Sequence, residues 1–276
     1  MKNPVGGPPV LLIHGNPGTL ADFADLAPRL DLASEVLAIE LPGFGGSPLD
    51  PTRELPSTLS ALAEVAFSIV EPLGWERFDV IGHSHGAGIA QAMAWLRSER
   101  IDELLLLGSL GLSAHLAYRQ LTAPGAKWAI SLMARCLRLP GGKAWLRALQ
   151  RGVVNSAFFP ELAPKGRLES EVARMLAEPQ ILVRMAELAG ARPCADLATN
   201  AVSIASPTHF MHGAADRLVP ARYAHAIHER RIESGRASSF ELIEDAGHML
   251  PLTHAAHIAE RYRALRSVPA QTFRTL

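Results

Sequence analysis

Cysteine is scarce in this chain, and long apolar runs are lacking. The 276 residues include two cysteines, Cys136 and Cys194, which form no disulfide framework, so we expect free thiols and a reducing cytoplasmic location. No apolar run approaches the roughly 20 residues that a membrane-spanning helix needs. The first apolar stretch, Val10–Ile13, is also too short for the core of a signal peptide. These absences predict a cytoplasmic chain without stable membrane insertion.

An excess of charge of either sign is lacking too. Lys and Arg together number 27, Asp and Glu also number 27, and the formal net charge is zero. No whole-chain field therefore favours nucleic acid, and we expect no nucleic-acid partner. A hydrophobic content of 48% over this length predicts one large domain with an insertion.

The chain does contain a regular alternation of short apolar strands with helical segments. Such alternation indicates an α/β fold, in which a mostly parallel sheet is covered by helices on both faces. Functional groups of these sheets lie at the carboxyl ends of the strands. Strands are expected at 10–13, 35–40, 78–81, 103–107, 208–211 and 240–243. Helices are expected at 20–30, 58–73, 87–99, 221–234 and 255–265.

The pentapeptide Gly82-His83-Ser84-His85-Gly86 joins one of these strands to the helical segment that follows. A serine at a tight strand-to-helix turn is held exposed as a nucleophile, and the flanking glycines allow the strained backbone. Because a serine hydroxyl is almost fully protonated at neutral pH, it needs a base within hydrogen-bond reach. We therefore expect Ser84 to be a nucleophile whose partners come from elsewhere in the chain.

A histidine and an acid follow two later strands. His248 comes after the strand at 240–243, and an imidazole with an ordinary pKa of about 6.5 can accept and return a proton near neutrality. Asp216 follows the strand at 208–211 and would orient the histidine and stabilise its charged form. Asp245 lies on the same loop as His248 and stays open as the alternative acid.

The order Ser84, Asp216, His248, each after a strand, resembles the α/β-hydrolase fold family. The loop Leu41-Pro42-Gly43-Phe44-Gly45-Gly46-Ser47 is similar to that family as well. The resemblance implies a core made of residues 1–112 and 201–276, with a helical cap, or lid, at 113–200.

The start of the chain departs from the pattern of this family. Only nine residues precede Val10, too few for the pair of strands with which the family usually opens, so we expect the first two strands to be lacking. The strand at 35–40 would then be an edge of the sheet. It is either a short protected edge, or it is covered by Ser267–Leu276 or by a second copy of the chain.

The resemblance also implies an oxyanion hole, because negative charge develops on the substrate carbonyl oxygen. We expect its donors to be the backbone N–H groups of Asn16 and His85, with the Asn16 side-chain amide as a substrate-binding group. The loop around Asn16 resembles the His-Gly-Gly-Pro-Gly loop of proline iminopeptidases, but Asn16 replaces a glycine and His85 stands where those enzymes have tryptophan. We expect His83 to be structural and the His85 ring to pack behind the turn, with a second-base role left open.

Residues 113–200 are predicted to form several helices separated by prolines. Lys127, Arg135 and Arg138 share one quadrant of a helical wheel, and Trp128 and Leu132 lie outside it. This separation predicts a basic amphipathic helix. This helix is either a lid that contacts anionic lipid or an acidic substrate, or a solvated face over an apolar acyl pocket. No acidic residue stands between Glu103 and Glu161, whereas seven basic ones do: Arg119, Lys127, Arg135, Arg138, Lys143, Arg147 and Arg151.

Two histidine pairs, His225 with His228 and His254 with His257, have the i, i+3 spacing of a metal site on predicted helices. Neither pair has a nearby cysteine or a convincing carboxylate, so we predict no metal. No glycine loop matches a phosphate or dinucleotide fingerprint, so we predict no cofactor.

These features together predict a serine hydrolase that cleaves a carboxylic ester or related acyl bond of a small, largely apolar substrate through an acyl-enzyme on Ser84. A thioesterase or a carbon–carbon bond hydrolase of the same fold is the nearest alternative. Met249 stands directly after the catalytic histidine, where the carbon–carbon hydrolases often carry tryptophan. A ligand-sensing protein with little turnover is the alternative from another class. The chain is expected to be a monomer or a homodimer, with weak surface association through the basic cap as a further possibility.

Overall fold

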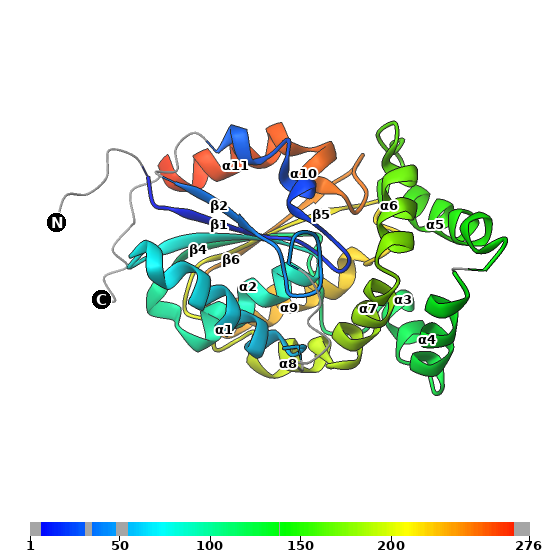
Figure 1. The fold of residues 1–276 in the computed structure, drawn as a ribbon. Helices are drawn as coiled ribbons and strands as arrows, with labels where there is room; N and C mark the ends of the chain where they lie inside the picture. The colour runs from blue at the N-terminus through cyan, green and yellow to red at the C-terminus, as the bar shows by residue number, and fades with distance from the viewer. Residues whose placement is uncertain (1–6, 31–34, 48–54, 138, 268–276) are drawn as a thin grey trace, which may run out of the picture.

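A computed structural model describes residues 7–30, 35–47, 55–137 and 139–267 of the chain. Its centre is a six-stranded parallel sheet with the order β2-β1-β3-β4-β5-β6 (Figure 1). The sheet and the helices around it confirm the predicted fold class. The strands are β1 (Val10–Ile13), β2 (Val36–Ile39), β3 (Phe78–His83), β4 (Ile101–Leu107), β5 (Thr208–Gly213) and β6 (Ser238–Ile243).

Helices cover both faces of the sheet because alternate side chains of each strand point to opposite faces. Leu11 and Ile13 of β1 pack under α1 (Leu59–Val70) and α2 (His85–Leu96), and α9 (Ala221–Glu233) covers the same face farther along. Val10 and Leu12 pack on the other face, against α11 (Ala255–Ser267). The sheet is therefore enclosed between two apolar layers.

Three of the predicted helices differ from the structure, and proline accounts for two of the differences. The third, predicted at 87–99, is α2 (His85–Leu96) followed by a 3₁₀ turn, Ser98–Arg100. The segment predicted as one helix at 20–30 forms two 3₁₀ turns, Leu20–Phe23 and Ala27–Arg29, with Pro28 in the second. The segment predicted at 58–73 ends its α-helix at Val70 and continues as a 3₁₀ turn, Glu71–Leu73, around Pro72. A proline has no N–H to donate to the preceding turn, so regular α-helix stops there.

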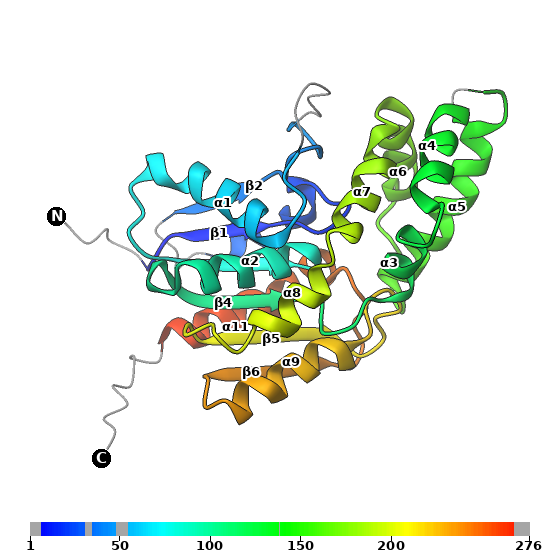
Figure 2. The ribbon, with the colours of Figure 1, turned by 90° about the horizontal axis from the view of Figure 1, so that it is seen from below.

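A helical insertion stands between β4 and β5, at the carboxyl ends of the strands (Figure 2). Part of it has its own apolar cluster, made by Leu137, Leu146, Val172, Met175 and Leu182. Its last helix instead packs on the main core through Leu197. The helices are α3 (Leu116–Leu121), α4 (Ala126–Cys136), α5 (Gly142–Phe158), α6 (Arg167–Ala177), α7 (Gln180–Gly190) and α8 (Pro193–Asn200).

Strand β2 is an edge of the described sheet, as the sequence predicts, and its first residue, Val36, is exposed. Of the covers considered for this edge, residues 268–276 lie outside the described part of the chain. None of the helices in the described ranges combines the length and apolar character that crossing a bilayer requires.

Candidate active site

Ser84 occupies the sharp turn between β3, which ends at His83, and α2, which begins at His85. Its backbone has φ 55° and ψ −115°, a conformation that non-glycine residues rarely adopt. The glycines of the motif are needed for close approach. A Cβ on Gly82 would lie 2.6 Å from the Cα of Ala87, and one on Gly86 would run into the carbonyl of Ile13. The sequence motif thus corresponds to a strained, tightly packed turn that carries a serine.

His248 and Asp216 meet in a short hydrogen bond, 2.7 Å between His248 Nδ1 and Asp216 Oδ2. The other carboxylate oxygen of Asp216 accepts the backbone N–H groups of Leu218 and Val219, each at 2.8 Å. Burial alone would raise the pKa of Asp216, but the charge of His248 and the hydrogen bonds from His212 and His248 outweigh it and hold this pKa well below its ordinary value. Asp216 is therefore ionised and fixed in position beside the imidazole.

The loop of His248 lies directly against the turn that carries Ser84. The His83 ring, 4.9 Å from the His248 ring, donates from Nε2 to the His248 carbonyl at 2.9 Å. Burial lowers the pKa of His83 to about 4, so this ring is a neutral donor. The N–H of Ser84 donates to Leu107 O at 2.9 Å, and a Cβ on the next residue, Gly108, would lie 3.3 Å from His248 Nδ1. The predicted nucleophile, base and acid thus gather at one end of the sheet.

Asp245, the alternative acid, lies elsewhere. Its side chain is 88% exposed and pairs with His254 at 3.5 Å. It has no hydrogen bond to His248, whose Nδ1 is occupied by Asp216. The geometry therefore favours Asp216 over Asp245 as the orienting acid.

The loop after β1 carries Asn16 past the serine. His14 anchors this loop, because its Nδ1 donates to Gly15 O at 2.8 Å while its Nε2 accepts the N–H of Leu41 at 3.0 Å. A Cβ on Gly15 would lie 3.0 Å from the Cβ of Ser84, so the loop backbone passes directly beside the serine. His85 is the first residue of α2, where backbone N–H groups have no partner within the helix.

The side chain of Asn16 contacts the helical insertion. Its amide nitrogen lies 3.2 Å from the Met185 carbonyl on α7 and 3.5 Å from the hydroxyl of Tyr118 on α3. Its oxygen Oδ1 is buried without a hydrogen-bond partner in the described structure. The residue predicted to bind substrate is therefore also a contact between the core and the insertion.

Tyr118 and His115 belong to this site, although sequence reasoning missed both. The Tyr118 hydroxyl lies 2.8 Å from His85 Nδ1, and the His115 ring lies 4.3 Å from the Tyr118 ring. Burial first, and then the cation of Arg184, lowers the pKa of His85 to about 3, so a neutral His85 accepts a hydrogen bond from the Tyr118 hydroxyl. Burial likewise lowers the pKa of His115 to about 4. No motif marks these residues, because they reach the site only through the packing of the insertion.

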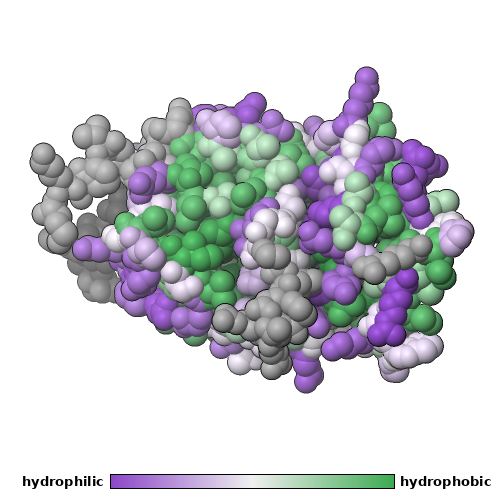
Figure 3. All heavy atoms as spheres, in the orientation of Figure 1, coloured by the Kyte–Doolittle hydropathy of each residue, from purple (hydrophilic) through white to green (hydrophobic). Residues whose placement is uncertain are grey.

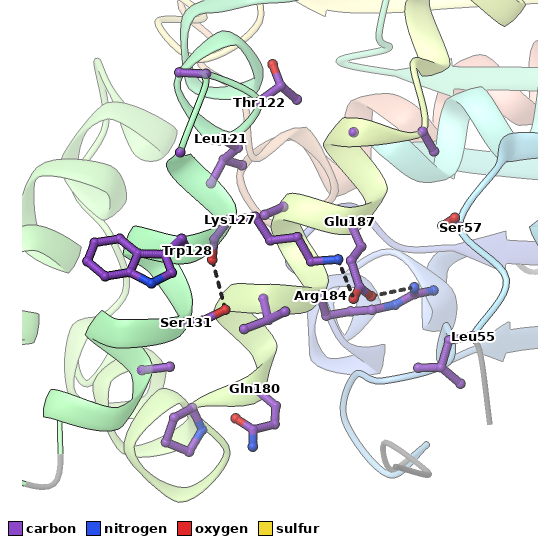
Figure 4. A pocket seen from close by; sticks show the side chains of 18 of the residues that line it. Leu55, Ser57, Leu121, Thr122, Lys127, Trp128, Ser131, Gln180, Arg184 and Glu187 are labelled. Atoms are coloured by element: carbon purple, nitrogen blue, oxygen red, sulfur yellow. Dashed lines mark hydrogen bonds and ion pairs between the residues drawn. The ribbon is translucent and has the colours of Figure 1, made fainter. Parts of the chain in front are cut away.

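A groove of about 1470 Å³ lies on the insertion, between α3 and α4 on one side and α7 on the other (Figure 4). Leu121, Trp128 and Val183 line it, together with Arg184 and Glu187. Ser84 is not part of its lining and is itself only 7% exposed. We therefore place the chemistry at Ser84, where the polar groups converge, and not in the groove.

The histidine pairs considered as metal ligands have other partners. His228 Nδ1 lies 2.9 Å from the Ser238 hydroxyl, His257 is bonded to Glu241, and His254 to Thr253. Within the ranges that the structure describes, no three His, Cys, Asp or Glu side chains are grouped to hold a metal ion. Both cysteines are free thiols, Cys136 exposed and Cys194 buried.

Comparison with known proteins shows which proteins this chain is similar to. A curated relative, a pimeloyl-[acyl-carrier protein] methyl ester esterase of Neisseria meningitidis, is 29% identical over 260 residues, which cover 92% of this chain and 91% of the relative. A serine hydrolase-like protein of Danio rerio is 34% identical over 108 residues, a match that covers 39% of this chain and only a third (33%) of that protein.

Solved structures and a family model show the fold. A hydrolase from Pseudomonas aeruginosa superposes with a TM-score of 0.73 at 21% identity, over 95% of this chain and 92% of that one. The model of the alpha/beta hydrolase fold matches residues 8–255. The chain therefore belongs to the alpha/beta hydrolase fold family.

Proposed function

We propose that this chain is a serine hydrolase that cleaves a carboxylic ester or related acyl bond of a small, largely apolar substrate. Ser84 attacks the carbonyl carbon while His248 takes the hydroxyl proton. The backbone N–H groups of Asn16 and His85 donate to the oxyanion that forms. When the C–O bond breaks, His248 returns the proton to the leaving alcohol and an acyl-enzyme remains. His248 then activates a water molecule, which releases the acid and restores Ser84.

The hydrogen bond between His248 and Asp216 is the observation that supports this proposal most strongly. The 2.7 Å contact leaves Nε2, the other ring nitrogen, as the group that can accept a proton from a serine. Asp216, held by two backbone N–H groups, fixes the orientation of the ring and stabilises its charged form. Such an arrangement is what general-base activation of a hydroxyl requires.

The helical insertion at 113–200 is proposed to be the cap of the enzyme, and residues 1–112 and 201–276 its core. Tyr118 and Met185 of the insertion contact Asn16, and Val154, Ala157 and Phe158 of α5 pack against Met249, the residue after the base. Apolar cap residues beside the base favour an apolar acyl group. The esterase activity in the name of the Neisseria relative is consistent with an ester substrate.

Hydrolysis of p-nitrophenyl esters, from acetate to dodecanoate, would test this proposal. We expect turnover by the unmodified chain and a loss of at least about a thousandfold in Ser84→Ala, because the nucleophile is gone. The preferred chain length would report the size of the acyl site. Retained turnover in Ser84→Ala would refute the assignment of the nucleophile.

A second series of substrates separates the ester activity from its alternatives. Thioesters of the same acyl chains distinguish a thioesterase. If a folded chain hydrolyses no ester or thioester, but Ser84 is labelled stoichiometrically by a fluorophosphonate, a ligand-sensing role would be favoured instead.

A further inference from the structure

The helical insertion carries more than half of the exposed large apolar side chains among the described residues. Among the described residues, fifteen large apolar side chains are exposed, and eight of them lie between residues 113 and 200. Both exposed tryptophans are in this group, Trp128 at 72% and Trp145 at 48%. Large exposed apolar side chains that gather on one element mark an interaction site.

These side chains form stripes at helical spacing on α4 and α5. Trp128 and Leu132 are one turn apart on α4, and Leu139 follows this helix. Trp145, Leu149 and Val153 are spaced by four residues along α5, next to its buried face, and all three are exposed. Residues four apart lie on one side of a helix. Each helix therefore buries one apolar face and leaves a second one uncovered.

The two stripes meet where the helices adjoin. Trp145, at the start of α5, lines a small hollow together with Met133, Cys136 and Leu137 from the end of α4. Both ribbon views place α4 and α5 at the end of the insertion that is far from the sheet (Figures 1 and 2). Figure 3 shows apolar residues beside strongly polar ones over this part of the molecule. We call the six apolar residues the outer cap surface: Trp128, Leu132, Leu139, Trp145, Leu149 and Val153.

Cations border the outer cap surface, and three of them form no ion pair in the part of the chain that the structure describes. Arg135, Lys143 and Arg151 are exposed and have no ion pair among the described residues. Arg147 pairs with Glu169 at 2.7 Å, and the side chain of Lys127 points away from Trp128 toward Glu187, 4.0 Å away (Figure 4). Arg138, which the sequence places in this basic group, lies outside the described residues.

The insertion and the rest of the chain carry net charges of opposite sign. Residues 113–200 contain 12 basic and 6 acidic residues, a net charge of +6, whereas the rest of the chain contains 15 basic and 21 acidic residues, a net charge of −6. An anionic surface would therefore attract the insertion and repel the core, which orients the molecule before contact.

We propose that the outer cap surface docks on a membrane surface that contains anionic lipids. Tryptophan rings beside leucines, bordered by arginine and lysine, are the composition of helices that lie in the bilayer interface. The apolar stripes would enter the headgroup region while the long cationic side chains reach the phosphates. An acidic protein could bind the insertion through charge alone. The apolar residues of the outer cap surface therefore favour lipid as the partner. This inference does not depend on the chemistry proposed for Ser84.

Co-sedimentation of the full chain with vesicles tests the proposal. We expect binding to vesicles of equimolar phosphatidylcholine and phosphatidylglycerol, little binding to phosphatidylcholine alone, and release as salt rises from about 0.1 M to about 1 M. Arg135→Ser/Lys143→Ser/Arg151→Ser should weaken binding about a hundredfold, since each cation near an anionic surface contributes about fivefold. Trp128→Ser/Trp145→Ser should weaken it at least tenfold, because the apolar contribution is lost.

A matched pair of exposed residues on the core provides the control. Arg230→Ser/Ile232→Ser removes one cation and one exposed apolar side chain from α9 and should bind like the unmodified chain. Ser84→Ala should also bind normally, so the outcome is separate from that of the hydrolase assay. Circular dichroism would verify that each variant is folded.

Lipids with brominated acyl chains give a second readout. They should quench the fluorescence of the unmodified chain but not that of Trp128→Ser/Trp145→Ser, whose remaining tryptophans, Trp75 and Trp95, lie in the core. Absence of binding to both kinds of vesicle, or binding that the cap substitutions leave unchanged, would overturn the proposal. Equally tight binding to soluble polyaspartate that is insensitive to the tryptophan substitutions would also overturn it, in favour of an acidic protein partner.

Discussion

The core and the helical insertion of this molecule are built differently. Around the sheet, apolar residues are enclosed between two helical layers, and β1, β3 and most of β4 are almost completely buried. The insertion has a small apolar cluster of its own and leaves tryptophans and leucines uncovered on its outward side. The core is also net acidic where the insertion is net basic.

This difference suggests that the core and the insertion have different roles. The proposed reacting groups, Ser84, Asp216 and His248, all come from core elements, whose tight packing can hold a strained turn and a short hydrogen bond. The insertion supplies Tyr118 and His115, which border the site, and a surface suited to interaction. Under the proposals above, the chemistry belongs to the core, and the selection of substrate and of location belongs to the insertion.

The largest effect should come from the acid in the core. Asp216→Asn should lower kcat for the preferred ester by about ten-thousandfold, because the imidazole loses its orienting carboxylate and the charge that stabilises its protonated form. Steady-state kinetics would measure this. Asp245→Asn is the matched control and should retain nearly full activity, since Asp245 is exposed and bonded to His254. A severe effect of Asp245→Asn with a mild effect of Asp216→Asn would reverse the assignment.

Truncating one leucine in the core and one on the insertion should show how differently the two regions contribute to the free energy of unfolding. Leu106, in the middle of β4, is fully buried, so Leu106→Ala should lower the free energy of unfolding by about 2–5 kcal/mol. Leu132 on α4 is 45% exposed, so Leu132→Ala should change it by no more than about 0.5 kcal/mol. Urea unfolding would measure both. Equal losses would contradict the idea that the outer face of the insertion is uncovered.

A buried carboxylate in the core should make stability depend on pH. Burial raises the pKa of Asp79 to about 7, against the opposing effects of Arg266 and the Tyr262 hydrogen bond. A folded-state pKa above the unfolded value near 4 means that the stabilisation is complete below pH 4 and is lost as pH rises through 7. Asp79→Asn should therefore flatten the decline in unfolding free energy between pH 4 and 8. If Asp79→Asn leaves the pH profile unchanged, Asp79 is not the cause of the decline in unfolding free energy.

The smallest expected effect concerns the contact between the two regions. Tyr118→Phe removes the hydroxyl that joins α3 to His85 and Asn16, which is worth about 0.5–1.5 kcal/mol for each hydrogen bond. We expect kcat to fall up to about tenfold, with a smaller change in KM, if the hydroxyl positions the oxyanion loop. Thr122→Ala, one turn along at the end of α3, is the control and should leave kcat unchanged. A rise in KM alone would indicate a role in substrate binding.

The sequence by itself determined the class of the fold and the place of the candidate chemistry. Alternating apolar strands and helices predict the parallel sheet because hydrophobic periodicity and turn residues act over short distances. The turn at Ser84 is similarly local, since its glycines and strained backbone lie within five residues. The chain order of Ser84, Asp216 and His248 identified three groups that the carboxyl ends of β3, β5 and β6 then bring to one edge.

Only the tertiary structure decided how the insertion meets the site and which of its faces stays uncovered. Tyr118 contacts Asn16, 102 residues away, and Met185 contacts it from 169 residues away. Such contacts depend on how whole helices pack, which no short pattern specifies. The preference for Asp216 over Asp245 also depends on the fold. Asp245 is only three residues before His248 in the chain, yet its exposed side chain pairs with His254, whereas Asp216, which follows another strand, bonds to the imidazole of His248.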